Sequence, residues 1–270
     1  MAQDFRTILV AGFPRSGTSL LHSLVCTSPQ VNPYVKECSW LTKLIHAYKY
    51  GKDTFTVHTS SFFDSPEAFR DYNRALLGGV LADTWRRLGG QPCLALKDPD
   101  LIFSLPEALE VFPGATAVLI VRDVRDVVAS QLMRMRRQHQ DPAWYDVAFL
   151  DAQVAHYVAA HSRLADATGL EDQVVCLRYE TLATRSAQAL AQLERLLGLP
   201  GMDASLAWKR ANFDITTFKD NEAYSNLYGQ GVSSANIGRH AGVLTAEDSA
   251  RLERHNGLVE RLLSRFPSVS

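Results

Sequence analysis

The segment from Thr7 to Leu21 places the strongest constraint on how this chain can fold. An apolar, strand-like run breaks at Gly12, crosses a short polar loop, and enters an apolar, helix-like run at Leu20. Gly12 and Gly17 permit backbone geometries that bring amide N–H groups close to an anion, and a following helix directs the positive end of its dipole to the same place. The segment therefore predicts a phosphate-binding loop between a strand and a helix.

This loop differs from that of the nucleotide triphosphatases. Their loop reads G-x-x-x-x-G-K-[ST], whereas Thr18 and Ser19 follow Gly17 directly here. Arg15 is the only cation in the loop. The sequence therefore predicts that an arginine takes part in holding the anion.

Three further apolar, β-rich runs follow, at residues 94–97, 115–121 and 173–179. Such runs suit strands that are buried on both faces, as in parallel α/β sheets. They alternate with segments of helical spacing, which predict helices at 65–88, 123–137, 145–167, 186–197 and 245–266. We therefore expect an α/β fold: one P-loop-like domain over residues 1–270, with a central parallel sheet flanked by helices.

The composition excludes several classes of partner. A net charge of −1 in 270 residues gives no overall basic field for nucleic acid or an anionic membrane. The first six residues hold no apolar signal region, and no apolar run approaches the about 20 residues of a membrane span. We expect a cytoplasmic chain with no membrane partner.

Neither the cysteines nor the histidines predict a metal site. The four cysteines are scattered without a C-x-x-C pair, which favours buried free thiols in a reducing compartment. The eight histidines form neither H-x-x-x-H nor H-E-x-x-H. We therefore expect no metal.

A second strand-to-helix passage carries a further pair of polar residues. Arg122 follows the apolar run 118–121, and Ser130 comes eight residues later. An arginine offers several fixed donors to a phosphate and a serine hydroxyl adds one more. The pair suits a second phosphate, separate from the first.

On these motifs the chain resembles the sulfotransferases that use 3′-phosphoadenosine 5′-phosphosulfate (PAPS). Residues 12–20 resemble the family's 5′-phosphosulfate loop, the Arg122 and Ser130 pair matches its 3′-phosphate pair, and residues 177–182 resemble its R-Y-E-x-L segment. The likeness extends from about residue 7 to 199. It implies PAPS as the donor, bound by Pro14, Arg15, Ser16, Gly17, Thr18, Ser19, Arg122, Ser130 and Arg239.

The form of two motifs indicates a branch of this family. The sequence Pro-Arg-Ser-Gly-Thr at 14–18 and Lys-Asp-Pro at 97–99 resemble tyrosylprotein and related bacterial and carbohydrate sulfotransferases more than the cytosolic phenol enzymes. The cytosolic members carry a lysine in the first loop and lysine-x-histidine after the second strand. Here these positions hold Arg15 and Pro99, so the histidine base is absent.

The catalytic residues follow from this resemblance together with the predicted topology. Sulfuryl transfer builds negative charge on the leaving oxygen, which Arg15 in the loop and Lys97 at a strand's carboxyl end are placed to stabilise. The resemblance implies a glutamate base soon after the first helix, which is Glu37 here. Asp98 is the alternative base.

The acceptor side of the site is less defined by the sequence. The Gly-rich loop 229–239, with Ser233, Ser234 and Arg239, is expected to cover the nucleotide, and Trp85 is expected to be core rather than an adenine platform. We expect a small-molecule acceptor. O- or N-sulfation and a homodimer are left open. Aromatic residues that could wall the acceptor pocket are Trp40, Tyr48, Tyr50, Phe55, Phe62, Phe63, Trp144 and Tyr145.

Two other function classes remain open at this point. A P-loop kinase acting on a small molecule would share the loop and could use Asp123 for Mg²⁺, but it needs a lysine after Gly17. A non-catalytic nucleotide-binding module would share the fold. The presence of Arg15, Glu37 and Lys97 together argues against such a module.

Overall fold

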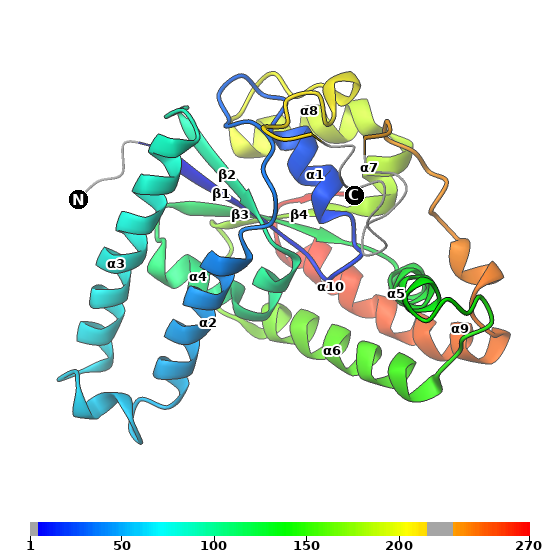
Figure 1. Ribbon diagram of the computed structural model, residues 1–270, viewed down its shortest axis with the longest axis horizontal. Helices are drawn as coiled ribbons and strands as arrows, with labels where there is room; N and C mark the ends of the chain where they lie inside the picture. Colours follow the sequence, from blue (N-terminus) through cyan, green and yellow to red (C-terminus); the bar gives the residue numbers. More distant parts are fainter. Residues whose placement is uncertain (1–4, 215–228) are drawn as a thin grey trace.

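A parallel β-sheet forms the centre of the computed structural model, which describes residues 5–214 and 229–270 (Figure 1). Its strands lie in the order β2-β1-β3-β4-β5, and each pair is parallel. The predicted α/β architecture is confirmed. The strands are β1 (Arg6–Ala11), β2 (Cys93–Lys97), β3 (Ala115–Val121), β4 (Val174–Arg178) and β5 (Ser268–Val269).

The helices of the described residues lie on both faces of this sheet (Figure 1). No helix of this part of the chain is long and apolar enough to cross a membrane. The helices of these residues are α1 (Thr18–Val25), α2 (Ser39–Asp53), α3 (Pro66–Arg87), α4 (Leu105–Val111), α5 (Val124–Gln138), α6 (Val147–Asp166), α7 (Tyr179–Thr184), α8 (Ser186–Leu197), α9 (Ala246–Glu253) and α10 (Gly257–Arg265).

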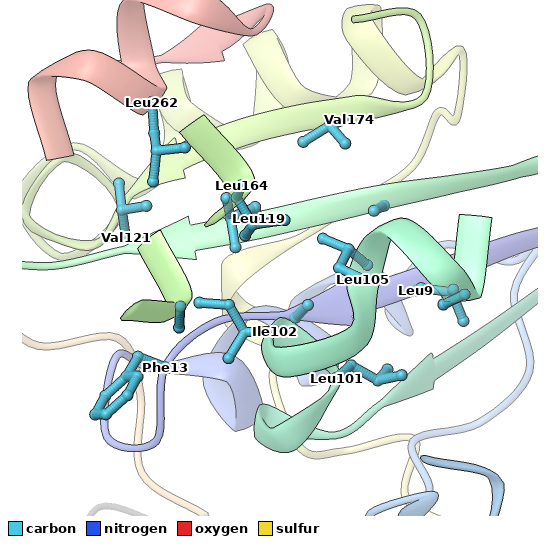
Figure 2. Close-up of a cluster of buried hydrophobic side chains, with 14 of the residues drawn as sticks. Leu9, Phe13, Leu101, Ile102, Leu105, Leu119, Val121, Leu164, Val174 and Leu262 are labelled. Carbon is cyan, nitrogen blue, oxygen red and sulfur yellow. The ribbon is translucent and has the colours of Figure 1, made fainter. Parts of the chain in front are cut away.

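The strands are mostly apolar because the two faces of the sheet contribute to two separate cores. In β1, Ile8 points to a core shared with α1 and α8, whereas Leu9 points to the opposite core. Figure 2 shows part of this second core, where Leu105 of α4 and Leu164 of α6 lie with Leu119 of β3. Successive strand residues face opposite sides, so a strand covered on both faces is apolar along most of its length, and the charged residues Arg6, Lys97 and Arg178 lie at strand ends.

The register of the strands brings the predicted site residues to one edge. Val10 of β1 pairs with Lys97, the last residue of β2, and Val121 at the end of β3 pairs with Arg178 at the end of β4. The loop after β1, Lys97 and Arg122 therefore emerge together at the carboxyl edge of the sheet. This edge is where ligands bind in open α/β sheets.

Most predicted helices are present, and their caps explain where they begin. Ser65 accepts a hydrogen bond from the Ala68 N–H at the start of α3, and Pro66 occupies the first helical position. Helices α6 and α8 lie within their predicted segments, and α5 ends one residue beyond its own. Helices α2, α4 and α7 and strand β5 were not predicted.

The single helix predicted over 245–266 is wrong, since the chain there forms α9 and α10 separated by a 3-10 turn at Arg254–Asn256. The Asn256 side-chain oxygen accepts a hydrogen bond from the Val124 N–H, at 2.9 Å, and so caps the start of α5. The predicted strand 173–179 also ends one residue early, because Tyr179 begins α7.

Candidate active site

The loop after β1 is a tight turn packed against its neighbours. The Ser16 N–H donates to the Phe13 carbonyl at 2.9 Å, and Gly17 has a φ of +101°, in the left-handed region that glycine favours. A Cβ on Gly17 would lie 2.7 Å from Cδ2 of Tyr179, and one on Gly12 would lie 2.6 Å from the Ile120 carbonyl oxygen. The two glycines are therefore required by close packing, and α1 begins immediately after them.

The predicted 3′-phosphate arginine is buried behind this loop. Arg122 is 5% exposed, and its guanidinium donates to the carbonyl oxygens of Arg15, at 2.9 Å, and Asn236, at 2.6 Å. Its Cζ also lies 4.3 Å from the ring centroid of Tyr179, the same ring that abuts Gly17. One tyrosine therefore packs against both predicted phosphate subsites.

Ser130 joins the two subsites from α5. Its hydroxyl accepts a hydrogen bond from Nε of Arg15 at 3.1 Å. Ser130 lies two turns into α5, whose first turn is capped by Asp123. The structure thus brings Arg15, Arg122 and Ser130 into one connected group, although Ser130 is 115 residues from Arg15 in the sequence.

A second group of residues lies at the end of β2. Lys97 is 1% exposed, and its Nζ donates to Oγ of Ser19 at 2.9 Å and to Oε1 of Glu37 at 2.7 Å. The Cys38 N–H donates to the Lys97 carbonyl at 2.9 Å, which fastens the segment carrying Glu37 to the strand end. The Glu37 side chain remains 35% exposed, so it is open to solvent on its far side.

Comparison with known proteins agrees with this geometry. The sequence profile described as the sulfotransferase family matches residues 7–204 of the chain. The chain belongs to the sulfotransferase family. This is the family that the sequence motifs predict.

The curated relatives of this sulfotransferase are named for tyrosine sulfation, which is consistent with the predicted branch. Protein-tyrosine sulfotransferase 1 of Danio rerio is 25% identical over 215 residues, which cover 76% of this chain and 56% of that protein. A putative protein-tyrosine sulfotransferase of Caenorhabditis briggsae is 29% identical over 130 residues, which cover 47% of this chain and 43% of that protein. The chain spans about half the length of these relatives.

Two solved sulfotransferase domains share its fold. The domain from the curacin biosynthetic pathway superposes with a TM-score of 0.61 at 12% identity, covering 95% of this chain and 99% of that domain. The domain from the Synechococcus PCC 7002 olefin synthase gives a TM-score of 0.55 at 14% identity, covering 95% of this chain and 96% of that domain. At these identities the comparison shows the fold alone.

The Gly-rich segment of the sulfotransferase is fastened to the donor side by a residue that the sequence did not single out. Asp126, 3% exposed in α5, accepts hydrogen bonds from the N–H of Gly238 at 2.8 Å and from the N–H and Nδ1 of His240 at 3.1 and 2.9 Å. Arg239 is exposed and donates to Asn236 of its own segment. The Ser233 hydroxyl likewise accepts from a neighbouring amide, that of Ala235.

Asp98, the alternative candidate for the base, caps a 3-10 turn. Asp98 is 3% exposed, and its Oδ1 accepts a hydrogen bond from the Asp100 N–H at 2.9 Å, which caps the 3-10 turn Pro99–Ser104. Its Oδ2 is buried without a hydrogen-bond partner among the described residues. Glu37, and not Asp98, is the carboxylate in contact with Lys97 in this part of the chain.

The aromatic residues expected around the acceptor do not form one wall. Trp85 stacks on Phe5 with centroids 4.8 Å apart and is core, as expected. Tyr48 is buried against Phe69 of α3. Phe55 and Phe63 also pack on Phe69. Trp144 packs on Phe149, and the Tyr145 hydroxyl donates a hydrogen bond to Asp248. Trp40, Tyr50 and Phe62 are instead 53, 65 and 83% exposed.

No group of three or more histidine, cysteine, aspartate or glutamate side chains within residues 5–214 and 229–270 is arranged to hold a metal ion. Asp123, the candidate for Mg²⁺ in a kinase, is instead paired with the Arg125 guanidinium, with Oδ2 to Nη2 at 2.6 Å.

Proposed function

We propose that this enzyme transfers the sulfuryl group of PAPS to a hydroxyl or amine of a small-molecule acceptor, with Glu37 as general base and Arg15 and Lys97 stabilising the leaving phosphate. The observation that carries the proposal is the position of Lys97. Its Nζ lies within hydrogen-bond distance of both Ser19 in the phosphate loop and Glu37. One cation thus joins the donor side of the site to the carboxylate.

The residues around the phosphate loop fit the donor. Oγ of Ser16 and Nε of Arg122 are buried and have no hydrogen-bond partner among the described residues. Such polar atoms cost free energy unless a ligand or water pairs with them. We assign residues 14–19 to the 5′-phosphosulfate and Arg122 with Ser130 to the 3′-phosphate, and Arg239 to a supporting role in the covering segment.

Glu37 and Lys97 act in sequence in the proposed reaction. The bond from sulfur to the 5′-phosphate oxygen breaks while the acceptor oxygen or nitrogen bonds to sulfur, and the acceptor proton moves to Glu37. A protonated Glu37 attracts Lys97 less than a carboxylate does. The positive charge of Lys97 then becomes available to the phosphate oxygen, where negative charge is growing.

The charge of the chain supports a small acceptor over an extended acidic polymer. The chain has a net charge of −1, and its sequence contains no basic stripe. The curated relatives, in contrast, are named as protein-tyrosine sulfotransferases. A tyrosyl peptide is therefore included as an outcome of the acceptor test.

The cytoplasm is the location that we propose. All four cysteines are buried and unpaired, and burial raises the pKa of the Cys38 and Cys176 thiols to about 12. Free thiols of this kind fit a reducing compartment.

The proposed base is tested by Glu37→Gln, which removes basicity and little volume. We expect kcat to fall by a factor of about 10² to 10⁴, while the Kd of 3′,5′-ADP stays within about twofold. Glu67→Gln, an exposed glutamate in the first turn of α3, is the matched control. Turnover of Glu37→Gln at the wild-type rate would refute Glu37 as base and direct the same test to Asp98.

The acceptor is identified by mass spectrometry with PAPS present. The panel contains phenols, alcohols, sugars, amines and a tyrosyl peptide, and the product is recognised by the mass gain of one SO₃ group. A gain on a small hydroxyl or amine compound supports the proposal. Sulfation of the peptide alone would refute the small-molecule acceptor.

A further inference from the structure

A buried aromatic group on α6 lies directly behind the donor site. Tyr157, 0% exposed, has its ring stacked on His161 with centroids 3.8 Å apart, and it meets the edge of Phe13 at 5.3 Å. Phe13 belongs to the loop after β1 and is one of the buried residues of the core drawn in Figure 2. The ring of Tyr157 therefore packs against the phosphate loop through Phe13.

The hydroxyl of the same side chain reaches the other subsite. Oη of Tyr157 donates to the carbonyl oxygen of Arg122 at 3.0 Å. Arg122 follows the last residue of β3 and precedes α5 by two positions, so it belongs to neither element. A buried carbonyl at such a junction needs a donor, and Tyr157 provides one.

The surroundings of Tyr157 keep this contact in place. Nδ1 of His161 lies 2.8 Å from the Tyr157 carbonyl, which holds the histidine ring against the tyrosine ring. Burial lowers the pKa of His161 to about 4, so the histidine is neutral at neutral pH and adds no positive charge beneath Arg122. The group is buried, and His161 adds no charge to it.

We propose that Tyr157 is a positioning residue for donor binding, whose hydroxyl fixes the backbone of Arg122 so that its guanidinium meets the 3′-phosphate. The proposal rests on the assignment of Arg122 to that phosphate. Phenylalanine at position 157 would fill the same volume and keep the contact with Phe13. It would lose only the bond to the Arg122 carbonyl.

The two ligands 3′,5′-ADP and 5′-AMP separate this role from a general loss of packing. Their Kd values are measured by calorimetry for the wild type and Tyr157→Phe. We expect the affinity for 3′,5′-ADP to fall about tenfold, as for one lost hydrogen bond, and the affinity for 5′-AMP to stay within about twofold. In turnover assays, KM for PAPS should rise while kcat at saturating PAPS stays near the wild-type value.

Tyr145→Phe is the matched control. Its hydroxyl donates to Asp248 at 2.6 Å and accepts from the Thr245 N–H at 3.3 Å, and so ties the connection between α5 and α6 to the start of α9. This variant should leave both affinities unchanged. Equal weakening of both nucleotides in Tyr157→Phe, or no weakening of either, would overturn the proposal.

A double-variant cycle distinguishes failure of the proposal from failure of the assignment beneath it. Arg122→Ala alone should weaken 3′,5′-ADP, and adding Tyr157→Phe to it should cause no further loss, because the two changes act through one contact. If Arg122→Ala leaves the affinity unchanged, the 3′-phosphate assignment is wrong. If the two losses add, Tyr157 acts independently of Arg122 and the proposed role is wrong.

Discussion

Two buried histidines should make the folding stability of this enzyme fall as the pH drops below 6.5. His22 and His161 are both 0% exposed, and burial lowers their pKa values to about 3 and about 4. For His22 the hydrogen bond to the Ala95 carbonyl opposes this shift, whereas the charge of Lys97 adds to it. Each ring has one nitrogen without a hydrogen-bond partner among the described residues, Nδ1 of His22 and Nε2 of His161.

The sign and the size of the effect follow from proton linkage. A histidine whose pKa is lowered in the folded state binds its proton mainly in the unfolded state below pH 6.5, so stability is full above that pH and is lost as the pH falls. At pH 5 both folded-state pKa values are still below the solution pH, so each histidine costs about 2 kcal/mol relative to pH 8. The pair together costs about 4 kcal/mol, a large part of a typical stability of about 5–15 kcal/mol.

Urea unfolding at pH 8 and pH 5 measures this difference for the wild type and for His161→Phe. The variant keeps an aromatic ring against Tyr157 but has no titrating nitrogen, so its stability should fall about 2 kcal/mol less over the same interval. His58→Gln, at an exposed position, should fall as much as the wild type. An equal fall in wild type and His161→Phe would refute the argument that His161 is buried in its neutral form.

Two further predictions concern the phosphate loop and the segment that covers it. Gly17→Ala should lower the free energy of unfolding by about 3 kcal/mol, because the new Cβ would sit at positive φ and 2.7 Å from a ring atom of Tyr179. Gly89 has the same φ of +101° but open space around it, so Gly89→Ala should cost about 1–2 kcal/mol. Thermal unfolding measures both costs. Equal costs would contradict the packing argument. Asp126→Ala should speed hydrogen exchange at the amides of Gly238 and His240 about tenfold or more, because both amides donate to the Asp126 carboxylate. The other α5 amides serve as the reference. Unchanged protection of the two amides would contradict the role of Asp126 in holding this segment.

The parts of the fold that local sequence determines were predictable. Strands β1 to β4 are mostly apolar because they are buried on both faces. The glycines after β1 predict a turn from local sequence alone, without information on the rest of the fold. Lys97 and Arg122 follow from the same reasoning, since each is placed at the carboxyl end of a strand. Their convergence needed only the assumption of a parallel sheet.

The contacts between distant segments were not predictable from local pattern. Asp126 and the Gly238 amide are 112 residues apart, and nothing in the spacing within α5 distinguishes Asp126 from a surface aspartate. Helix α2 was missed because Trp40, Leu44 and Tyr50 are 53, 38 and 65% exposed, so apolar residues occupy its outer face as well as its buried one. The break between α9 and α10 likewise depends on a tertiary contact with α5.

The two buried cations of the site are held in different ways, and the difference matches their proposed tasks. Arg122 donates hydrogen bonds to two carbonyl oxygens, and its ion pair with the Asp126 carboxylate is longer, at 3.8 Å, so neutral acceptors orient the guanidinium while the carboxylate lies beyond hydrogen-bond distance. Lys97 instead contacts the Glu37 carboxylate directly, at 2.7 Å. The 3′-phosphate keeps its charge during sulfuryl transfer, so a fixed cation suffices there. The 5′-phosphate gains charge as the acceptor loses its proton, and a lysine paired with the proton acceptor responds to both changes at once.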